Sequence, residues 1–278
     1  MVISFDTFRL TTIVASDGSS MRMSQFYLTN NSAKSREQCA EKLKTKVGVD
    51  CSVEQIICSS SSAASYLTDI DFDKSLKVLV VGHEGIHIEL QMAGYETIKC
   101  GDVAPGKGGG PQCTIPDFEA FELDRGIGAV VAGVDDSFTY SKLCAASLCL
   151  QRQSTSVFVA TNRDVGDRVG VGESDDGRQI PGAGPIIACL ETASGRQAVN
   201  VGKGGKWLLP WLTKRFSLES GRTVVVGDRL DTDIALGKDA NMLTILPLTG
   251  VTSVEQLREA GPNDQPDLVI DSIAALIA

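Results

Sequence analysis

Histidine is scarce in this chain, which contains two histidines in 278 residues, and its eight cysteines form no C-x-x-C pair. We therefore expect no zinc site built from those ligands. No apolar run approaches the ~20 residues that a membrane-spanning helix needs. The first residues also lack the basic start and the long apolar stretch of a secretory signal. These absences predict a reducing, intracellular compartment and favour the cytoplasm, with an organelle left open because the N-terminus is unusual.

Positive charge is also scarce, because the chain has 26 Lys and Arg residues and 35 Asp and Glu residues. Its net charge is -9. Nucleic acid and anionic membrane are therefore not expected as partners. A chain of this charge that handles a phosphate must place a few cations or a metal locally. Cys144 and Cys149 lie in an apolar helical pattern, which predicts that both are core thiols.

Apolar β-branched runs alternate with amphipathic stretches through most of the sequence, a pattern typical of α/β proteins with parallel sheets. Two stretches rich in Gly, 101–116 and 164–184, interrupt it and are expected to be loops. The expected strands are 77–81, 129–132, 156–160, 222–226 and 242–246, and the expected helices are 35–46, 84–93, 141–150, 230–238 and 253–260.

The segment VVVGDRLDTDI, residues 224–234, carries the strongest chemical signal. An apolar strand ends at Asp228, a helix follows, and Asp233 lies five residues on. Ligands bind at the carboxyl ends of strands in open α/β sheets. Two carboxylates at such a position suit a hard cation such as Mg²⁺. The alternative is an Asp N-cap followed by a solvated helix charge.

Two further segments indicate phosphate binding. In FYLTNNS, residues 26–32, hydroxyl, amide and backbone N–H groups converge between a strand and a helix, as in an anion cradle. A simple N-cap by Asn31 or Ser32 is the alternative. In VNVGK, residues 199–203, Lys203 could supply a point charge to a phosphate, or could only solvate the surface. The segment does not fit a P-loop.

In this order and at these distances, LTNNS, VGK and GDRLDTDI resemble motifs two, three and four of the haloacid dehalogenase-like hydrolases. The nearer resemblance is to the 4-nitrophenylphosphatase and phosphoglycolate phosphatase branch, which also contains pyridoxal phosphatase. It extends from about residue 26 to the end. Supporting segments are VVGHEG, VAGVDDSFTYSKL, ATNRD, IPGAGPI, ETASGRQ and TILPLTGVTS.

The resemblance implies a Rossmann-like parallel-sheet core in two pieces, residues 1–80 and 200–278. An α/β cap domain, residues 81–199, is inserted between them. In that family the cap closes over the active site and sets substrate choice. The resemblance also suggests a homodimer formed through the cap.

Site residues follow from the same resemblance. Thr29 would hydrogen-bond the transferring phosphoryl group, the backbone at Asn30 would contact the same oxygens, and Asn31 would fix the loop. Lys203 would neutralise phosphate charge and steady the nucleophile. It is followed by Gly204, where the family commonly has Pro.

For the metal, the resemblance implies that Asp228 is a ligand of Mg²⁺ and that Asp233 is a nearby acid outside the first coordination shell. The family's reaction uses an Asp nucleophile that forms an aspartyl-phosphate, which water then hydrolyses. A second Asp, two residues on, transfers the proton.

The first motif of that family, D-x-D-G, is absent. The nearest candidate nucleophile and metal ligand is Asp6, in ISFDTF, whose plus-two position is Phe8 and cannot transfer a proton. Asp17 with Gly18 is the other candidate. Two explanations remain open: a damaged or misassigned N-terminus of a normal enzyme, or a true pseudophosphatase.

The sequence therefore predicts a Mg²⁺-dependent phosphatase acting on a small phosphomonoester, such as 2-phosphoglycolate or 4-nitrophenyl phosphate. The alternatives are a pyridoxal 5′-phosphate phosphatase and a catalytically inactive phosphate-binding protein.

Overall fold

The computed structural model describes residues 11–16, 23–106, 112–152, 156–168 and 178–276. The chain divides into two compact units. Unit 1 comprises Met1–Asn30, Arg36–Ile57 and Lys203–Ala278, and unit 2 comprises Asn31–Ser35 and Cys58–Gly202. Among the described residues, none of the helices combines the length and apolar character that crossing a bilayer requires.

Unit 1 is built on a six-stranded sheet with the order β13-β12-β11-β1-β2-β3. Strands β11, β12 and β13 run parallel, which places their carboxyl ends at one edge. Its strands are β1 (Thr11–Ser16), β2 (Met23–Thr29), β3 (Ile56–Cys58), β11 (Thr223–Val226), β12 (Leu243–Pro247) and β13 (Leu268–Ile270). Its α-helices are α1 (Arg36–Val47), α8 (Leu208–Phe216), α9 (Ala235–Asp239) and α10 (Val254–Glu259).

The core of unit 1 forms where α8 and α9 cover the sheet. Leu28 on β2, Val225 on β11 and Leu212 on α8 are buried together, and Phe26 packs against this cluster. Phe26 also contacts Phe216, with ring centroids 4.2 Å apart. This packing links strands from both ends of the chain.

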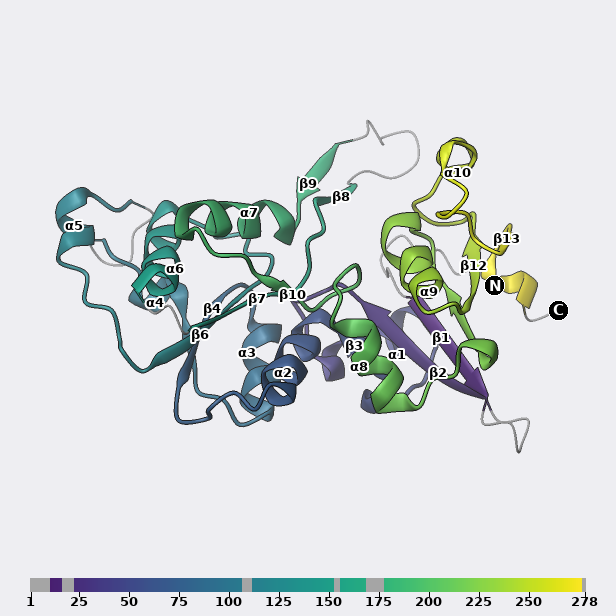
Figure 1. Ribbon diagram of the computed structural model, residues 1–278, viewed down its shortest axis with the longest axis horizontal. Coiled ribbons are helices and arrows are strands. Elements are labelled where there is room, and N and C mark those ends of the chain that lie inside the picture. Colours follow the sequence, from purple (N-terminus) through teal and green to yellow (C-terminus); the bar gives the residue numbers. More distant parts are fainter. Residues whose placement is uncertain (1–10, 17–22, 107–111, 153–155, 169–177, 277–278) are drawn as a thin grey trace. The chain divides into compact units, whose positions relative to one another are not determined.

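Unit 2 contains a five-stranded, all-parallel sheet with the order β10-β7-β6-β4-β5 and a separate two-stranded hairpin. Figure 1 shows α6 and α7 on one side of this sheet and α2 and α3 on the other. Its strands are β4 (Lys77–Val81), β5 (Thr97–Lys99), β6 (Ile127–Ala132), β7 (Val157–Ala160), β8 (Gly166–Arg168), β9 (Gln179–Pro181) and β10 (Val199–Asn200). Its helices are α2 (Ser59–Asp69), α3 (Glu84–Met92), α4 (Cys100–Val103), α5 (Ile115–Glu119), α6 (Tyr140–Arg152) and α7 (Ala183–Ser194).

Both faces of this sheet are covered, so its central strands β4, β6 and β7 are buried almost throughout, as expected for a parallel sheet. Val130 on β6, Phe158 on β7 and Leu79 on β4 contribute to one core with Ala146 on α6 and Leu190 on α7. All five strands predicted from apolar runs are present, with bounds that shift by one or two residues.

Four features differ from the sequence prediction. The stretches 101–116 and 164–184, expected to be loops, contain most of α4 and the start of α5, and the strands β8 and β9, respectively. Residues 58–80 group with unit 2 rather than with the core, because β4 pairs with β5 and β6. Strand β1 runs antiparallel to both of its neighbours, β2 and β11. Cys149 is buried as predicted, but Cys144 is half-buried. Five helical residues turn the side chain by about 140°, so the two thiols cannot share one face.

Candidate active site

Strands β2 and β11 end at the same edge of the unit 1 sheet. Thr12 of β1 pairs with Tyr27 on one side and with Val226 on the other. Both neighbours run antiparallel to β1 and therefore parallel to each other. Thr29 and Asp228 each lie two residues beyond the paired position, so they reach the same level of this edge. Two strand spacings, about 10 Å, separate their strands.

Lys203 is held at this site by two long-range contacts. Its backbone N–H donates to Asn30 Oδ1 at 2.8 Å, and its Nζ donates to Asp233 Oδ1 at 2.8 Å. All three residues are buried, and the side chains of Lys203 and Asp233 are 4% and 1% exposed. A buried ammonium is tolerated when a carboxylate compensates its charge, as Asp233 does here.

A π-helical turn, Leu230–Ile234, places Asp233 against the sheet. Its Oδ2 accepts a hydrogen bond from the Arg229 N–H at 3.2 Å, while its own N–H donates to the Arg229 carbonyl at 3.0 Å. A Cβ atom at Gly227 would lie 2.5 Å from the Asp233 carboxyl carbon. Gly227 is therefore required for the close approach of this side chain.

Asp228 has a different environment, because it is half-buried. Its Oδ2 accepts from the Val251 N–H at 2.8 Å, and its carbonyl accepts from Thr252 Oγ1 at 2.6 Å. The bond from Val251 orients the carboxylate, the bond from Thr252 holds the backbone, and Oδ1 has no partner among the described residues. Asp231, three residues after Asp228 in the sequence, is exposed. The hydrogen bond from Arg229 lowers the pKa of Asp231.

Asp228 is better suited than Asp233 to be a ligand of Mg²⁺. Mg²⁺ is often bound through one or two carboxylates together with water and substrate phosphate. Asp228 offers an oriented carboxylate at the sheet edge, whereas both oxygens of Asp233 already accept hydrogen bonds. The described part of the chain contains no cluster of three His, Cys, Asp or Glu side chains that would hold a metal by themselves.

The turn after Lys203 explains a departure noted in the sequence. Gly204 has a φ of 83°, in the left-handed region. Proline cannot adopt that angle because its ring holds φ near -65°. Glycine at this position is therefore consistent with the backbone that carries Lys203.

The predicted site residues are thus partly brought together. Asn30, Lys203 and Asp233 are in direct contact, and Thr29 and Asp228 lie at one sheet edge. Asn31 is exposed in unit 2, where its Oδ1 accepts from the Lys34 N–H at 3.1 Å.

The two candidates for the first motif, Asp6 and Asp17 with Gly18, lie outside the described residues. The direction of β1 is relevant to both candidates, because they lie on opposite sides of this strand in the sequence. Its first residue, Thr11, is at the edge that carries Thr29 and Asp228, and its last residue, Ser16, is at the opposite edge. In the sequence, Asp6 lies before Thr11 and Asp17 directly follows Ser16.

Two features of the site were missed in the sequence. The Asn30 side chain, rather than only its backbone, holds the Lys203 loop. Arg229 pairs with Asp231 through two hydrogen bonds of 3.0 and 2.7 Å. The R-x-D spacing in GDRLDTDI was the available signal for this pair.

Comparison with known proteins supplies independent findings. A family model described as HAD-hydrolase-like matches residues 200–276, and one described as haloacid dehalogenase-like hydrolase matches residues 17–96. Phosphoglycolate phosphatase 2 of Arabidopsis thaliana is 37% identical over 256 residues, covering 90% of this chain and 80% of that protein.

Two solved structures have the same fold. A p-nitrophenyl phosphatase from Archaeoglobus fulgidus aligns with a TM-score of 0.70 and 26% identity, covering 91% of this chain and 84% of that one. A glycerol phosphate phosphatase from Mycobacterium tuberculosis, in complex with magnesium, aligns with a TM-score of 0.69 and 27% identity. That alignment covers 90% of this chain and 66% of the other.

Proposed function

This chain belongs to the haloacid dehalogenase-like hydrolases, among their phosphatases, and we propose that it hydrolyses a small phosphomonoester in a Mg²⁺-dependent reaction. The first candidate substrate is 2-phosphoglycolate. The observation that carries the proposal is the linked set Asn30, Lys203 and Asp233 at the sheet edge where Asp228 also lies. Each comes from a different segment of the chain, and each suits one task in binding a phosphate and a dication.

Lys203 is the proposed phosphate-binding cation. Its ammonium has three N–H groups, of which one donates to Asp233. Because the side chain is buried, its charge is little screened by solvent and interacts strongly with an incoming oxyanion. Asp233 fixes the position of the ammonium before substrate arrives, so little reorganisation is needed in the transition state.

Thr29 and Asp228 complete the proposed binding edge. The Thr29 hydroxyl is proposed to donate to a phosphoryl oxygen, and the Asp228 carboxylate to hold Mg²⁺. When bound, Mg²⁺ supplies charge that offsets repulsion between an anionic nucleophile and the phosphate dianion. The hydrogen bond from the Val251 N–H to the Asp228 carboxylate supports this assignment, because ligating carboxylates are usually held by further hydrogen bonds.

The nucleophile is proposed to be Asp6, which would form an aspartyl-phosphate. The support is that Thr11, the first residue of β1, lies at the edge that carries Thr29 and Asp228, and Asp6 precedes Thr11 in the sequence. The proton transfer made by the family's second Asp is not available from Phe8. We therefore expect slower turnover than in a chain with a complete D-x-D-G.

The absent D-x-D-G and the antiparallel β1 favour a second candidate function, phosphate binding without turnover. Both functions share Lys203 and Asp228, and they differ in the need for a nucleophile.

Pyridoxal 5′-phosphate is the alternative substrate. A homodimer through unit 2 remains a prediction.

A direct experiment separates these proposals. Release of phosphate from 2-phosphoglycolate, pyridoxal 5′-phosphate and 4-nitrophenyl phosphate is measured with and without Mg²⁺, alongside binding of inorganic phosphate by calorimetry. Mg²⁺-dependent release that disappears in Asp6→Asn supports the enzyme and its nucleophile. Phosphate binding without release supports the inactive binding protein, and neither binding nor release rejects both.

A further inference from the structure

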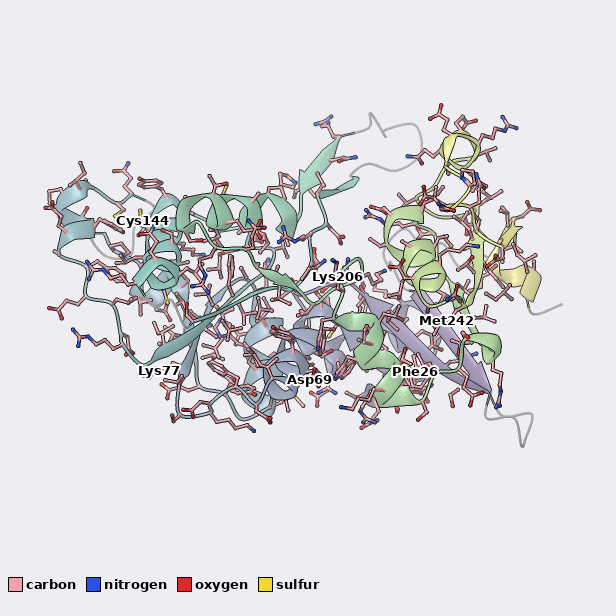
Figure 2. The ribbon with its side chains drawn as sticks, viewed as in Figure 1. Phe26, Asp69, Lys77, Cys144, Lys206 and Met242 are labelled. Carbon is pink, nitrogen blue, oxygen red and sulfur yellow. The ribbon has the colours of Figure 1, made fainter. Side chains whose placement is uncertain are left out.

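Cys113 and Cys144 both belong to unit 2, whereas the site described above is in unit 1. Cys113 immediately precedes the N-cap of α5, and Cys144 lies in the second turn of α6. Both line one cavity of about 250 Å³, together with Tyr140 and Leu143. Figure 2 shows Cys144 on α6, in the part of unit 2 where α5 also lies.

The two thiols are neighbours, because both line this cavity and Cys144 contributes to the pKa shift of Cys113. Burial and this contact raise the pKa of Cys113 to about 11. The neighbouring Cys144 thiol raises the pKa of Tyr140, which lines the same cavity. Cys113 is therefore mostly protonated at neutral pH, and it becomes more reactive as the pH rises.

Access distinguishes this pair from the other cysteines. Both thiols are half-buried beside a cavity, whereas Cys39, Cys58, Cys100 and Cys149 are buried. The remaining cysteines, Cys51 and Cys189, are accessible to differing degrees. Cys113 and Cys144 are thus the pair that the structure both brings together and leaves open to a reagent.

The backbone next to Cys113 and the helix turn that carries Cys144 are both held in place, which limits the distance between the two cysteines. Thr114 forms a capping box with Asp117, in which the Thr114 N–H donates to Asp117 Oδ2 at 2.9 Å and the Asp117 N–H donates to Thr114 Oγ1 at 3.4 Å. This fixes the backbone next to Cys113. On the other side, Ala145 and Ala146 of α6 are buried in the core of unit 2, which fixes the helix turn that carries Cys144.

We propose that Cys113 and Cys144 form a modification site, a dithiol that closes to an intramolecular disulfide by exchange with a small oxidised disulfide such as oxidised glutathione. One cysteine thiolate attacks the small disulfide and releases one small thiolate, which takes up the proton that the cysteine lost. The second cysteine then attacks the mixed disulfide and releases the second small thiol in the same way. Two protein thiols and one small disulfide thus give one protein disulfide and two small thiols.

The test uses the full chain, equilibrated in mixtures of oxidised and reduced glutathione at mildly alkaline pH and then mapped by peptide mass spectrometry without reduction. We expect one dominant intramolecular disulfide, between Cys113 and Cys144, and a fall in titratable thiols from eight to six. Oxidation should also raise the unfolding temperature, because the bond restricts the unfolded chain between the two cysteines.

Matched variants separate this pair from general thiol oxidation. Cys113→Ser and Cys144→Ser should each abolish the disulfide and the rise in unfolding temperature, while Cys51→Ser and Cys189→Ser should keep both. A stable glutathione adduct at Cys113 or Cys144 that never closes, or a dominant disulfide between other cysteines, would overturn the proposal. Differential alkylation of the unmodified chain gives the same answer without relying on the folding of any variant. None of these measurements depends on phosphatase activity.

Discussion

The backbone N–H of Lys203 donates to Asn30 Oδ1 at 2.8 Å, across a sequence separation of 173 residues. This bond joins the end of β2 to the loop that enters the C-terminal part of unit 1. It places the backbone of Lys203 beside the end of β2, where Thr29 also lies. The site therefore depends on two chain segments that meet only in the folded protein.

Asn30→Ala should destabilise the protein by about 1–3 kcal/mol, because the buried Lys203 N–H loses its acceptor. Inorganic phosphate should also bind more weakly, since the Lys203 loop is no longer fixed. Urea unfolding and calorimetry measure the two effects. Asn31→Ala is the control, because Asn31 is exposed and its side chain bonds the nearby Lys34 N–H. Equal effects of the two substitutions would contradict the role of Asn30.

Lys203→Met should lower the free energy of unfolding by about 3–5 kcal/mol, because Asp233 would be left as an uncompensated buried charge. The double variant Lys203→Met with Asp233→Asn should recover much of this loss. Denaturant titration of the four proteins in a double-mutant cycle measures the coupling. Lys206→Met is the control, since Lys206 is exposed three residues further on (Figure 2). Additive losses in the cycle would show that the pair is not coupled.

Asp228→Asn should weaken Mg²⁺ binding at least about tenfold, or ~1.4 kcal/mol, because a neutral amide replaces the oriented carboxylate. The readout is the Mg²⁺-dependent rise in unfolding temperature, and any Mg²⁺-dependent phosphate release should disappear as well. Asp231→Asn provides the comparison, because Asp231 is exposed and bonded to Arg229. The assignment fails if Asp228→Asn responds to Mg²⁺ as the unchanged chain does.

Because of Asp267, the free energy of unfolding should fall in acid. The hydrogen bond from Lys238, with further bonds from Thr244, lowers the pKa of Asp267 to about 2. A depressed pKa in the folded state gives stability that is present above the ordinary Asp value of about 4 and is lost as the pH falls toward 2. Because Asp267 is exposed, screening limits this contribution to about 1 kcal/mol.

Asp267→Asn should flatten the pH dependence of unfolding over that range, measured by urea titration at a series of pH values. Added salt should weaken the effect in the unchanged chain, because the pair with Lys238 is partly exposed. A pH slope that is the same in Asp267→Asn would assign the acid sensitivity to other carboxylates.

Local pattern determined most of the elements. Buried parallel strands appear as continuous apolar runs, so the strand predicted at 77–81 matches β4 and the helix predicted at 84–93 matches α3 within one residue. The motif residues Thr29 and Asp228 lie at the carboxyl ends of apolar strands, and the carboxyl ends of parallel strands share an edge. Their meeting at one edge could therefore be expected from sequence.

The direction of β1 and the partners of Lys203 were decided by the tertiary structure. An apolar run looks the same in a parallel and an antiparallel strand, because direction depends on the chain path between strands rather than on the residues within them. The bond from Asn30 and the ion pair with Asp233 join residues distant in sequence, and no local pattern encodes such contacts. For the same reason, the helical pattern around Cys144 indicated a helix but could not show that its thiol faces Cys113.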